Sequence, residues 1–403
     1  MNNLIKNIYT PILSLFLFAI GSGLLNTLLV FKLNSNGEGS IAIGAMTSFY
    51  YLGLVFGSFK IEKIIIRTGH IRTFSTFAAI LTAAVLTHSL TYDLYLWLCL
   101  RVISGFATAG LFIVIESWLL TVGSNKNRGT MLSIYMVSLY LAQVLGQLLL
   151  KFNSPDSSAL FIAIGITSVL SIIPLSLTKI QSPILEEASA LSLKKIFSLT
   201  KTGVVGCFCG GLILSSIYGL FPLYLIQTTS SDFVITGMSV VILGGMFWQY
   251  PIGKISDKIE RRKVLIFLSI GTAICSLLLI FAIQSIALAC FLIFILGGLS
   301  FTIYPISISH ACDSLKANEI TSGTQALLLA YSLGAVMGPL ISPIFMSLIG
   351  PNGFFVYMIL ISSFLIYYTF WRQSVTDTIE PDEPFITMPT TSPLISTLDP
   401  RGD

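Results

Sequence analysis

Long apolar runs recur along the whole chain and constrain its fold more than any other feature. An α-helix of about 20 apolar residues crosses a hydrocarbon core roughly 30 Å thick. The chain is 54% hydrophobic and 10% charged, whereas soluble domains carry roughly 25% charged residues. The alternation typical of a membrane β-barrel is absent. We therefore predict an all-α, polytopic membrane protein with twelve spans, at residues 10–32, 41–65, 73–91, 94–121, 130–151, 158–178, 201–226, 234–253, 263–283, 286–311, 321–347 and 352–372.

A change of composition divides the chain between the sixth and seventh runs. Residues 179–200 are polar at first and then compatible with a short amphipathic surface helix. This predicts an N-terminal six-helix bundle (1–178), a cytoplasmic linker (179–200) and a C-terminal six-helix bundle (201–373). The tail, residues 374–403, is rich in Pro, Thr, Ser and acidic residues. Such a composition buries too little apolar surface to fold, so we expect a disordered cytoplasmic tail.

The distribution of Lys and Arg predicts the orientation of the spans. These residues gather in the loops of one side, for example at Arg67, Arg72 and Lys254, whereas the loops of the other side carry Lys32 and Lys151. The positive-inside rule then places both termini and the linker in the cytoplasm. We expect a multi-pass protein of the bacterial inner (plasma) membrane. The net charge of +4 reflects this topology and gives no support to a nucleic-acid partner.

The fourth run carries two charges, at Arg101 and Glu116, fifteen residues and roughly 22 Å apart along a helix. An ionisable residue inside a span costs at least ~2.5 kcal/mol on insertion scales, so a functional role is the default hypothesis. Alternatively, Glu116 is structural and binds Arg128 or Tyr135 at the cytoplasmic rim. The same ambiguity applies to His310 and Asp313, which can relay protons or be ordinary helix-end residues. The proton-coupling candidates are Glu116, Arg101, His310 and Asp313.

Amide and aromatic side chains inside the spans indicate a cavity for a neutral or amphipathic organic solute. Amides fix the orientation of such a solute and aromatic rings cover its apolar part. Trp and Tyr also gather at membrane interfaces and amides also join helices, so a structural role stays an alternative. The cavity candidates are Asn26, Tyr50, Tyr51, Phe112, Trp118, Gln143, Gln147, Trp248, Gln249, Gln325 and Tyr331.

The two halves share a spacing that indicates an internal repeat. Glu116 precedes Gly129-Thr130 by thirteen residues, and His310 precedes Gly323-Thr324 by the same thirteen. Transporters built from repeated bundles show echoes of this kind.

The loop GKISDKIERRK (253–263) resembles the cytoplasmic signature loop of the major facilitator superfamily. Further motifs resemble the YcaD-like group of that superfamily: FYYLGLVFGS (49–58), RTGHIRTF (67–74), NRGTMLSIYMVSLYLAQVLGQLLL (127–150), QYPIGKISD (249–257) and YPISISHACD (304–313). The resemblance implies two pseudo-symmetric six-helix bundles and a secondary transporter that works by alternating access. It also implies proton handling by Arg101, which begins an Arg-x-x-x-Gly pattern.

Within the signature loop, Asp257 can accept hydrogen bonds from the N-terminus of a neighbouring helix, where unpaired N–H groups favour an anion. In the superfamily arrangement the partner is the start of span five, Gly129-Thr130. We therefore expect a conformational latch formed by Gly253, Asp257, Arg261, Arg262 and Arg128. The alternative is a solvated charged turn.

The sequence gives little support to an enzymatic function. It contains no phosphate-binding Gly-rich loop with Lys-Ser/Thr and no zinc-ligand spacing, so we expect neither catalysis nor a cofactor nor a metal. The predicted partners are a small organic solute, protons and the lipid bilayer, with the monomer as the functional unit and with uptake and efflux both compatible. The alternative is a non-transporting membrane sensor or scaffold, since Ile66 stands where the first signature loop of the superfamily carries Asp.

Overall fold

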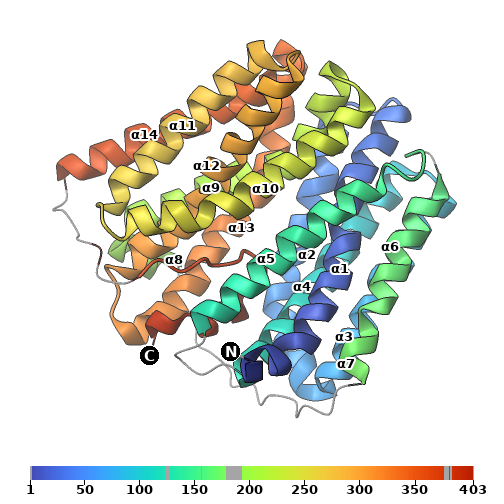
Figure 1. The fold of residues 1–403 in the computed structure, drawn as a ribbon, viewed down its shortest axis with the longest axis horizontal. Coiled ribbons are helices and arrows are strands. Elements are labelled where there is room, and N and C mark those ends of the chain that lie inside the picture. The colour runs from blue at the N-terminus through green and yellow to red at the C-terminus, as the bar shows by residue number, and fades with distance from the viewer. Residues whose placement is uncertain are drawn as a thin grey trace.

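The computed structural model describes residues 2–122, 128–155, 157–177, 193–375, 381 and 384–402, apart from the side chains of 2–7, 120–122, 193–195, 317–318 and 402. Within these ranges, twelve helices are long and apolar enough to cross a membrane, which confirms the predicted fold class. Figure 1 shows them as two groups. The N-terminal half holds α1 (Asn2–Ser35), α2 (Ser40–Thr68), α3 (His70–Leu90), α4 (Leu94–Val122), α5 (Arg128–Leu149), α6 (Ser158–Leu170) and α7 (Ile172–Ser176).

The C-terminal half follows a short helix, α8 (Leu193–Leu199), which covers the end of the predicted linker. Residues 179–192 of that linker lie outside the described residues. The helices of this half are α9 (Lys201–Thr228), α10 (Ser231–Ser256), α11 (Arg261–Ala282), α12 (Ile286–Cys312), α13 (Ala317–Ile349) and α14 (Gly353–Val375).

Both halves pack their helices in the same pairs. In the N-terminal half α1 packs on α5 and α2 on α4, and in the C-terminal half α9 packs on α13 and α10 on α12. Glycines allow the close approach: a Cβ on Gly105 would lie 2.0 Å from the carbonyl oxygen of Tyr50, and a Cβ on Gly211 would lie 2.0 Å from that of Tyr331. Small residues at such contacts let membrane helices approach to backbone distance.

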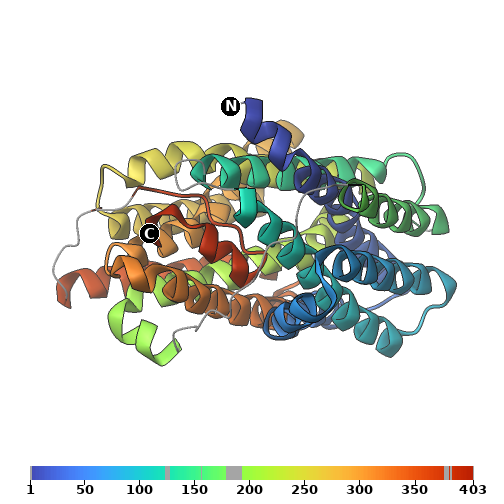
Figure 2. The same cartoon turned by 90° about the horizontal axis from the view of Figure 1, so that it is seen from below.

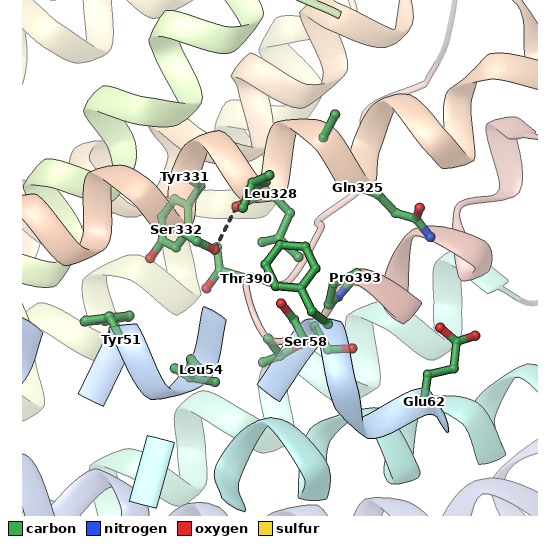
Figure 3. A pocket seen from close by; sticks show the side chains of 15 residues that line it. Tyr51, Leu54, Ser58, Glu62, Gln325, Leu328, Tyr331, Ser332, Thr390 and Pro393 are labelled. Atoms are coloured by element: carbon green, nitrogen blue, oxygen red, sulfur yellow. Dashed lines mark hydrogen bonds between the residues drawn. The ribbon is translucent and has the colours of Figure 1, made fainter. Parts of the chain in front are cut away.

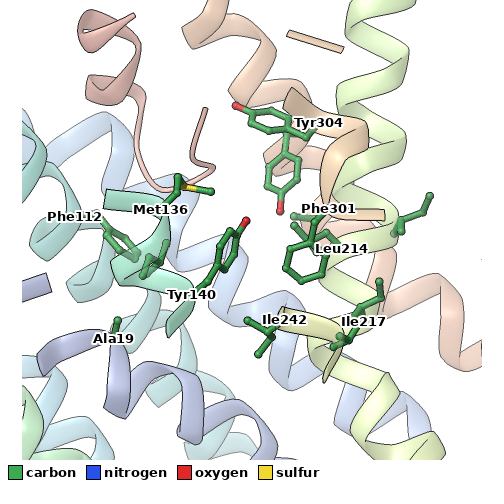
Figure 4. Packing of buried hydrophobic residues seen from close by; sticks show 14 of the residues in the cluster. Ala19, Phe112, Met136, Tyr140, Leu214, Ile217, Ile242, Phe301 and Tyr304 are labelled. Atoms are coloured by element: carbon green, nitrogen blue, oxygen red, sulfur yellow. The ribbon is translucent and has the colours of Figure 1, made fainter. Parts of the chain in front are cut away.

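The two halves meet at one end of the molecule and separate toward the other. At the closed end α2 touches the C-terminal half, since a Cβ on Gly44 would lie 1.9 Å from the carbonyl oxygen of Pro339 and one on Gly219 would lie 2.6 Å from Thr47 Oγ1. Both chain termini lie at the opposite end, which we call the terminal end (Figure 1). Midway, buried apolar side chains of the two halves face each other, among them Phe112, Tyr140 and Phe301 (Figure 4).

The C-terminal tail differs from its prediction. Residues 384–402 form an extended stretch and two 3₁₀ turns, η2 (Pro393–Leu398) and η3 (Pro400–Gly402), and Figure 2 shows these turns between the two halves. Ile386, Met388, Ile395 and Leu398 are buried. The composition argument fails here because the tail does not need a core of its own: its apolar side chains are buried against the membrane helices.

Candidate functional site

A cavity of about 90 Å³ lies between the two halves. Its walls come from α1, α2, α4 and α5 on one side and from α9 and α13 on the other, and the C-terminal segment closes it toward the terminal end. Amides, hydroxyls and aromatic rings predominate among the polar wall residues, which are Ser22, Asn26, Tyr50, Tyr51, Tyr140, Gln143, Tyr218, Tyr331, Thr390 and Thr391. The predicted candidates Asn26, Tyr50, Tyr51, Phe112, Gln143 and Tyr331 all lie in this wall.

A second cavity of about 220 Å³ lies nearer the terminal end, between α2 and α13. Tyr51 and Tyr331 belong to both cavities, so the two are neighbours. Figure 3 shows Glu62 on α2 and Gln325 on α13 at one side of this cavity, with Thr390 and Pro393 of the C-terminal segment between the helices. The predicted candidate Gln325 therefore lies in this outer cavity.

Arg101 is buried about two turns after the start of α4, toward the closed end, with 1% of its surface exposed. Its Nη2 donates to Asn26 Oδ1 at 2.5 Å and its Nε to the carbonyl oxygen of Met46 at 3.2 Å. The guanidinium carbon lies 4.4 Å from the centre of the Tyr50 ring, a cation–π arrangement. All these partners are neutral, so the cation contributes positive potential beside the central cavity.

Glu116 is fully buried two turns before the end of α4. Its partners among the described residues are hydroxyl groups: Tyr135 donates to Oε1 at 2.8 Å, and the hydroxyls of Thr391 and Ser392 donate to Oε1 and Oε2. The sequence singled out Tyr135 as a structural partner of Glu116, and the structure shows that contact. The two partners from the C-terminal segment could not be foreseen, because nothing in the Thr-Thr-Ser run indicates where it lies.

Two amides form hydrogen bonds between the halves. Tyr218 of α9 donates to Gln143 Oε1 on α5 at 3.0 Å, and Gln249 Nε2 of α10 donates to the hydroxyl of Tyr140 on α5 at 3.0 Å. The sequence pattern predicts Gln143 and Gln249 as cavity residues but not Tyr140. In the sequence alone, a tyrosine that faces a cavity looks the same as one at a membrane interface.

Four predicted candidates line neither cavity: Gln249, whose bond to Tyr140 is given above, and three residues that pack within one half. Trp118 is buried beside His70, with ring centres 5.6 Å apart. Gln147 Nε2 donates to the carbonyl oxygen of Gly23 at 2.6 Å and so joins α5 to α1. Trp248 packs between α10 and α12 against Phe294. Their contacts are those of helix packing.

Four of the five predicted latch residues, Gly253, Asp257, Arg261 and Arg262, lie at the terminal end of the C-terminal half, whereas Arg128 belongs to the N-terminal half. Arg261 is buried and its Nη1 binds Asp313 Oδ1 at 2.7 Å, while its Nη2 lies 3.4 Å from Asp257 Oδ1. Arg262 Nε donates to Glu260 Oε1 at 2.5 Å. Asp257 also accepts the backbone N–H of Phe385 at 2.7 Å.

The remaining charged candidates are spread over both halves. His310 is buried near the end of α12, 4% exposed, and Arg128 begins α5. The structure thus gathers Asp257, Arg261 and Asp313 into one cluster, while Arg101 and Glu116 lie separately on α4. Among the described residues, no group of three or more His, Cys, Asp or Glu side chains is arranged to hold a metal ion.

Comparison with known proteins supports the same fold. The family model described as Major Facilitator Superfamily matches residues 12–339 and 238–395. An uncharacterized MFS-type transporter of Yersinia pestis (strain Pestoides F) is 30% identical over 345 residues, which cover 85% of this chain and 89% of the relative. The uncharacterized MFS-type transporter YcaD of Escherichia coli O7:K1 is 32% identical over 349 residues, with 85% and 89% covered.

Solved transporters share the fold at low sequence identity. The nucleoside transporter NupG aligns with a TM-score of 0.71 and 13% identity, over 93% of this chain and 99% of the other. A bacterial homolog of the human lysosomal transporter Spinster, in an inward-facing and unoccupied conformation, aligns with a TM-score of 0.74 and 14% identity, over 91% of this chain and 96% of the other.

Proposed function

This chain belongs to the Major Facilitator Superfamily, and from that premise we propose that it is a secondary active transporter that carries a small organic solute by alternating access, coupled to protons. The observation that carries the proposal is the cavity between the halves. Direct helix contacts close it at one end, while toward the other end it borders a larger cavity and the C-terminal segment. Rocking two bundles around such a site exposes it to each side in turn.

The terminal end faces the cytoplasm in this proposal. Arg67 and Arg72 lie at that end, as do Lys254 and Lys258, whereas Lys32 lies at the closed end. This distribution follows the positive-inside rule for an inner-membrane protein. The structure then corresponds to an inward-facing arrangement, as in the Spinster homolog.

The walls of the cavity favour an organic solute with an aromatic or apolar part. Tyr50 and Tyr51 lie edge to face, with ring centres 5.5 Å apart, and such ring faces cover flat apolar groups. Asn26 and Gln143 supply amide groups that orient polar substituents. Arg101 sets the charge of the cavity, because no carboxylate among the described residues binds it.

Glu116 is the leading proton carrier. A hydroxyl can donate to a carboxylate or accept from a carboxylic acid, so the hydroxyl partners of Glu116 accommodate both protonation states. A carboxylate held by a guanidinium does not have this freedom, because the cation offers donors alone. An intramembrane acid of this kind can load and release a proton when the cavity opens to water.

Transport by reconstituted protein tests the proposal. Proteoliposomes are screened with organic solutes, with and without an imposed pH gradient. We expect at least one solute to accumulate when the gradient is imposed. Glu116→Gln should abolish this accumulation but keep counterflow exchange, because the amide resembles the protonated acid permanently. The matched control is Glu38→Gln, which changes a carboxylate in a loop at the closed end. Accumulation by Glu116→Gln at the wild-type level would contradict proton coupling through Glu116.

A non-transporting sensor or scaffold is the second candidate. It is favoured by the C-terminal segment in the mouth of the cavity and by Ile66 in the first signature loop. If folded protein exchanges no solute in counterflow, whether the C-terminal segment is bound or released, the result would support this candidate over transport.

A further inference from the structure

The C-terminal residues 384–402 lie in the mouth between the two halves at the terminal end (Figures 1 and 2). We propose that this segment is a tethered plug: the inner faces of the two halves form a binding surface whose partner is the chain's own C-terminus, and the bound plug locks the transporter inward-facing. The lock rests on the proposed alternating-access function, whereas the binding does not.

The plug is anchored first on the C-terminal half, next to the signature loop. The backbone N–H of Phe385 donates to Asp257 Oδ1 at 2.7 Å. The ring of Phe385 lies over Gly253, where an added Cβ would come within 2.1 Å of it. A glycine at position 253 therefore leaves room for an aromatic ring from the tail. Asp257, the acid expected to latch the two halves, is instead engaged by the plug.

A second anchor lies on the N-terminal half. The hydroxyls of Thr391 and Ser392 reach the fully buried carboxylate of Glu116, which also accepts from Tyr135 at 2.8 Å. Charge-assisted hydrogen bonds of this kind are the stronger class, particularly away from water. Thr390 and Thr391 also form part of the wall of the central cavity, so the plug stands in the path between that cavity and the terminal end.

The third anchor is the pair of 3₁₀ turns. Ile395 and Leu398 are buried, and η2 packs on both α4 and α13. Beyond them Arg401 binds Asp399 through two hydrogen bonds of 2.8 and 2.7 Å, and its Nη1 donates to Ser309 Oγ at 3.1 Å. Both members of the ion pair are buried. A free tail would keep these charges in water, so their burial indicates a formed binding surface.

The anchors span both halves, and this has a mechanical consequence. Glu116 belongs to the N-terminal half, and Asp257 and Ser309 belong to the C-terminal half. Closing the terminal end would bring the two halves together where the plug now lies. The plug must therefore leave before the transporter can open at its other end.

Hydrogen–deuterium exchange of the full-length protein in lipid nanodiscs tests the binding. Wild-type amides in 384–402 should be protected. Leu398→Asp places a charge in a buried apolar site and should raise exchange across the segment by more than about tenfold. Phe385→Ala removes the ring over Gly253 but keeps the backbone N–H bond to Asp257, so it should raise exchange less. Ser374→Asp adds the same charge at the exposed end of α14, outside the segment, and should change nothing. Exchange of the wild-type segment at the rate of an unstructured peptide would overturn the proposal.

Cysteine accessibility at the closed end tests the lock. Thr47 is buried between α2 and α9, so Thr47→Cys should react with an impermeant maleimide only when that end opens. Each variant is compared with the same variant that retains Thr47, in which labelling comes from the native cysteines alone. Adding Leu398→Asp should raise the labelling of Thr47→Cys several-fold, while adding Ser374→Asp should not. If Leu398→Asp raises the exchange of the segment but leaves the labelling of Thr47→Cys unchanged, the lock is overturned. Neither measurement depends on finding a solute.

Discussion

In the N-terminal half Arg101 and Glu116 are buried among neutral partners, whereas in the C-terminal half Arg261 is buried against Asp313. The helix pairs of the two halves are the same, so the fold does not explain this difference. In α12, His310 stands at the position that corresponds to Glu116. Ile295 stands at the position that corresponds to Arg101, since it precedes His310 by the same fifteen residues. Among the described residues, the buried charges that have neutral partners thus belong to the N-terminal half.

The difference distinguishes charges that stabilise the structure from charges that we propose act in transport. A buried pair has its partner within the protein and gains nothing from a proton or a solute. A buried charge with neutral partners has a desolvation cost that those partners offset only in part. A bound ion or ligand of opposite charge can offset the rest. We therefore expect substitutions in the C-terminal pair to act on stability and substitutions of Arg101 or Glu116 to act on transport.

The largest effect on stability is expected from breaking the buried pair. Arg261→Ala leaves Asp313 buried without its cation and should lower the free energy of unfolding by ~3 to 5 kcal/mol. Denaturant unfolding in mixed micelles measures it. The double variant Arg261→Met/Asp313→Leu should recover most of the loss. On the same helix, Lys263→Ala removes the exposed partner of Glu260 and should cost about 1 kcal/mol or less. If Lys263→Ala lowered the free energy of unfolding as much as Arg261→Ala, the buried pair would not differ from the exposed pair.

A smaller effect tests the shared helix pairs. Gly105→Ala in the α2–α4 pair and Gly297→Ala in the corresponding α10–α12 pair each place a Cβ 2.0 Å from a carbonyl oxygen and should each destabilise by ~1 to 3 kcal/mol. The same unfolding measurement applies, with Gly129→Ala as the control, since a Cβ there meets no atom within 4 Å. A large loss in one half and none in the other would show that the halves are not packed alike.

The smallest effect on stability is expected at Arg101. Arg101→Met removes three neutral contacts but also the cost of burying the cation, so the free energy of unfolding should stay within about 1 kcal/mol of the wild type. Counterflow exchange of the solute should nevertheless fall at least ~10-fold. Arg67→Met, at an exposed arginine, should change neither quantity. A strongly destabilised but still active Arg101→Met would make Arg101 structural.

The sequence predicted the elements of the fold well because a membrane span has an unmistakable signature. Every predicted run corresponds to a helical span, and Arg101 and Glu116 lie on one helix, as predicted. Roles that depend on contacts between distant segments were not predictable. Trp118 and Gln147 have the residue types of a cavity wall but face their own bundle. The tail was misjudged because its composition says nothing of the surface on which it lies.

The most direct test of the account follows proton movement during solute transport. Proteoliposomes that contain a pH-sensitive dye report proton flux when the solute found in the uptake screen is added. The account predicts solute-dependent proton flux for the wild type and for Arg261→Met/Asp313→Leu, and none for Glu116→Gln. Proton flux retained in Glu116→Gln, or lost in the folded double variant, would contradict the claim that the unpaired charge of the N-terminal half couples transport.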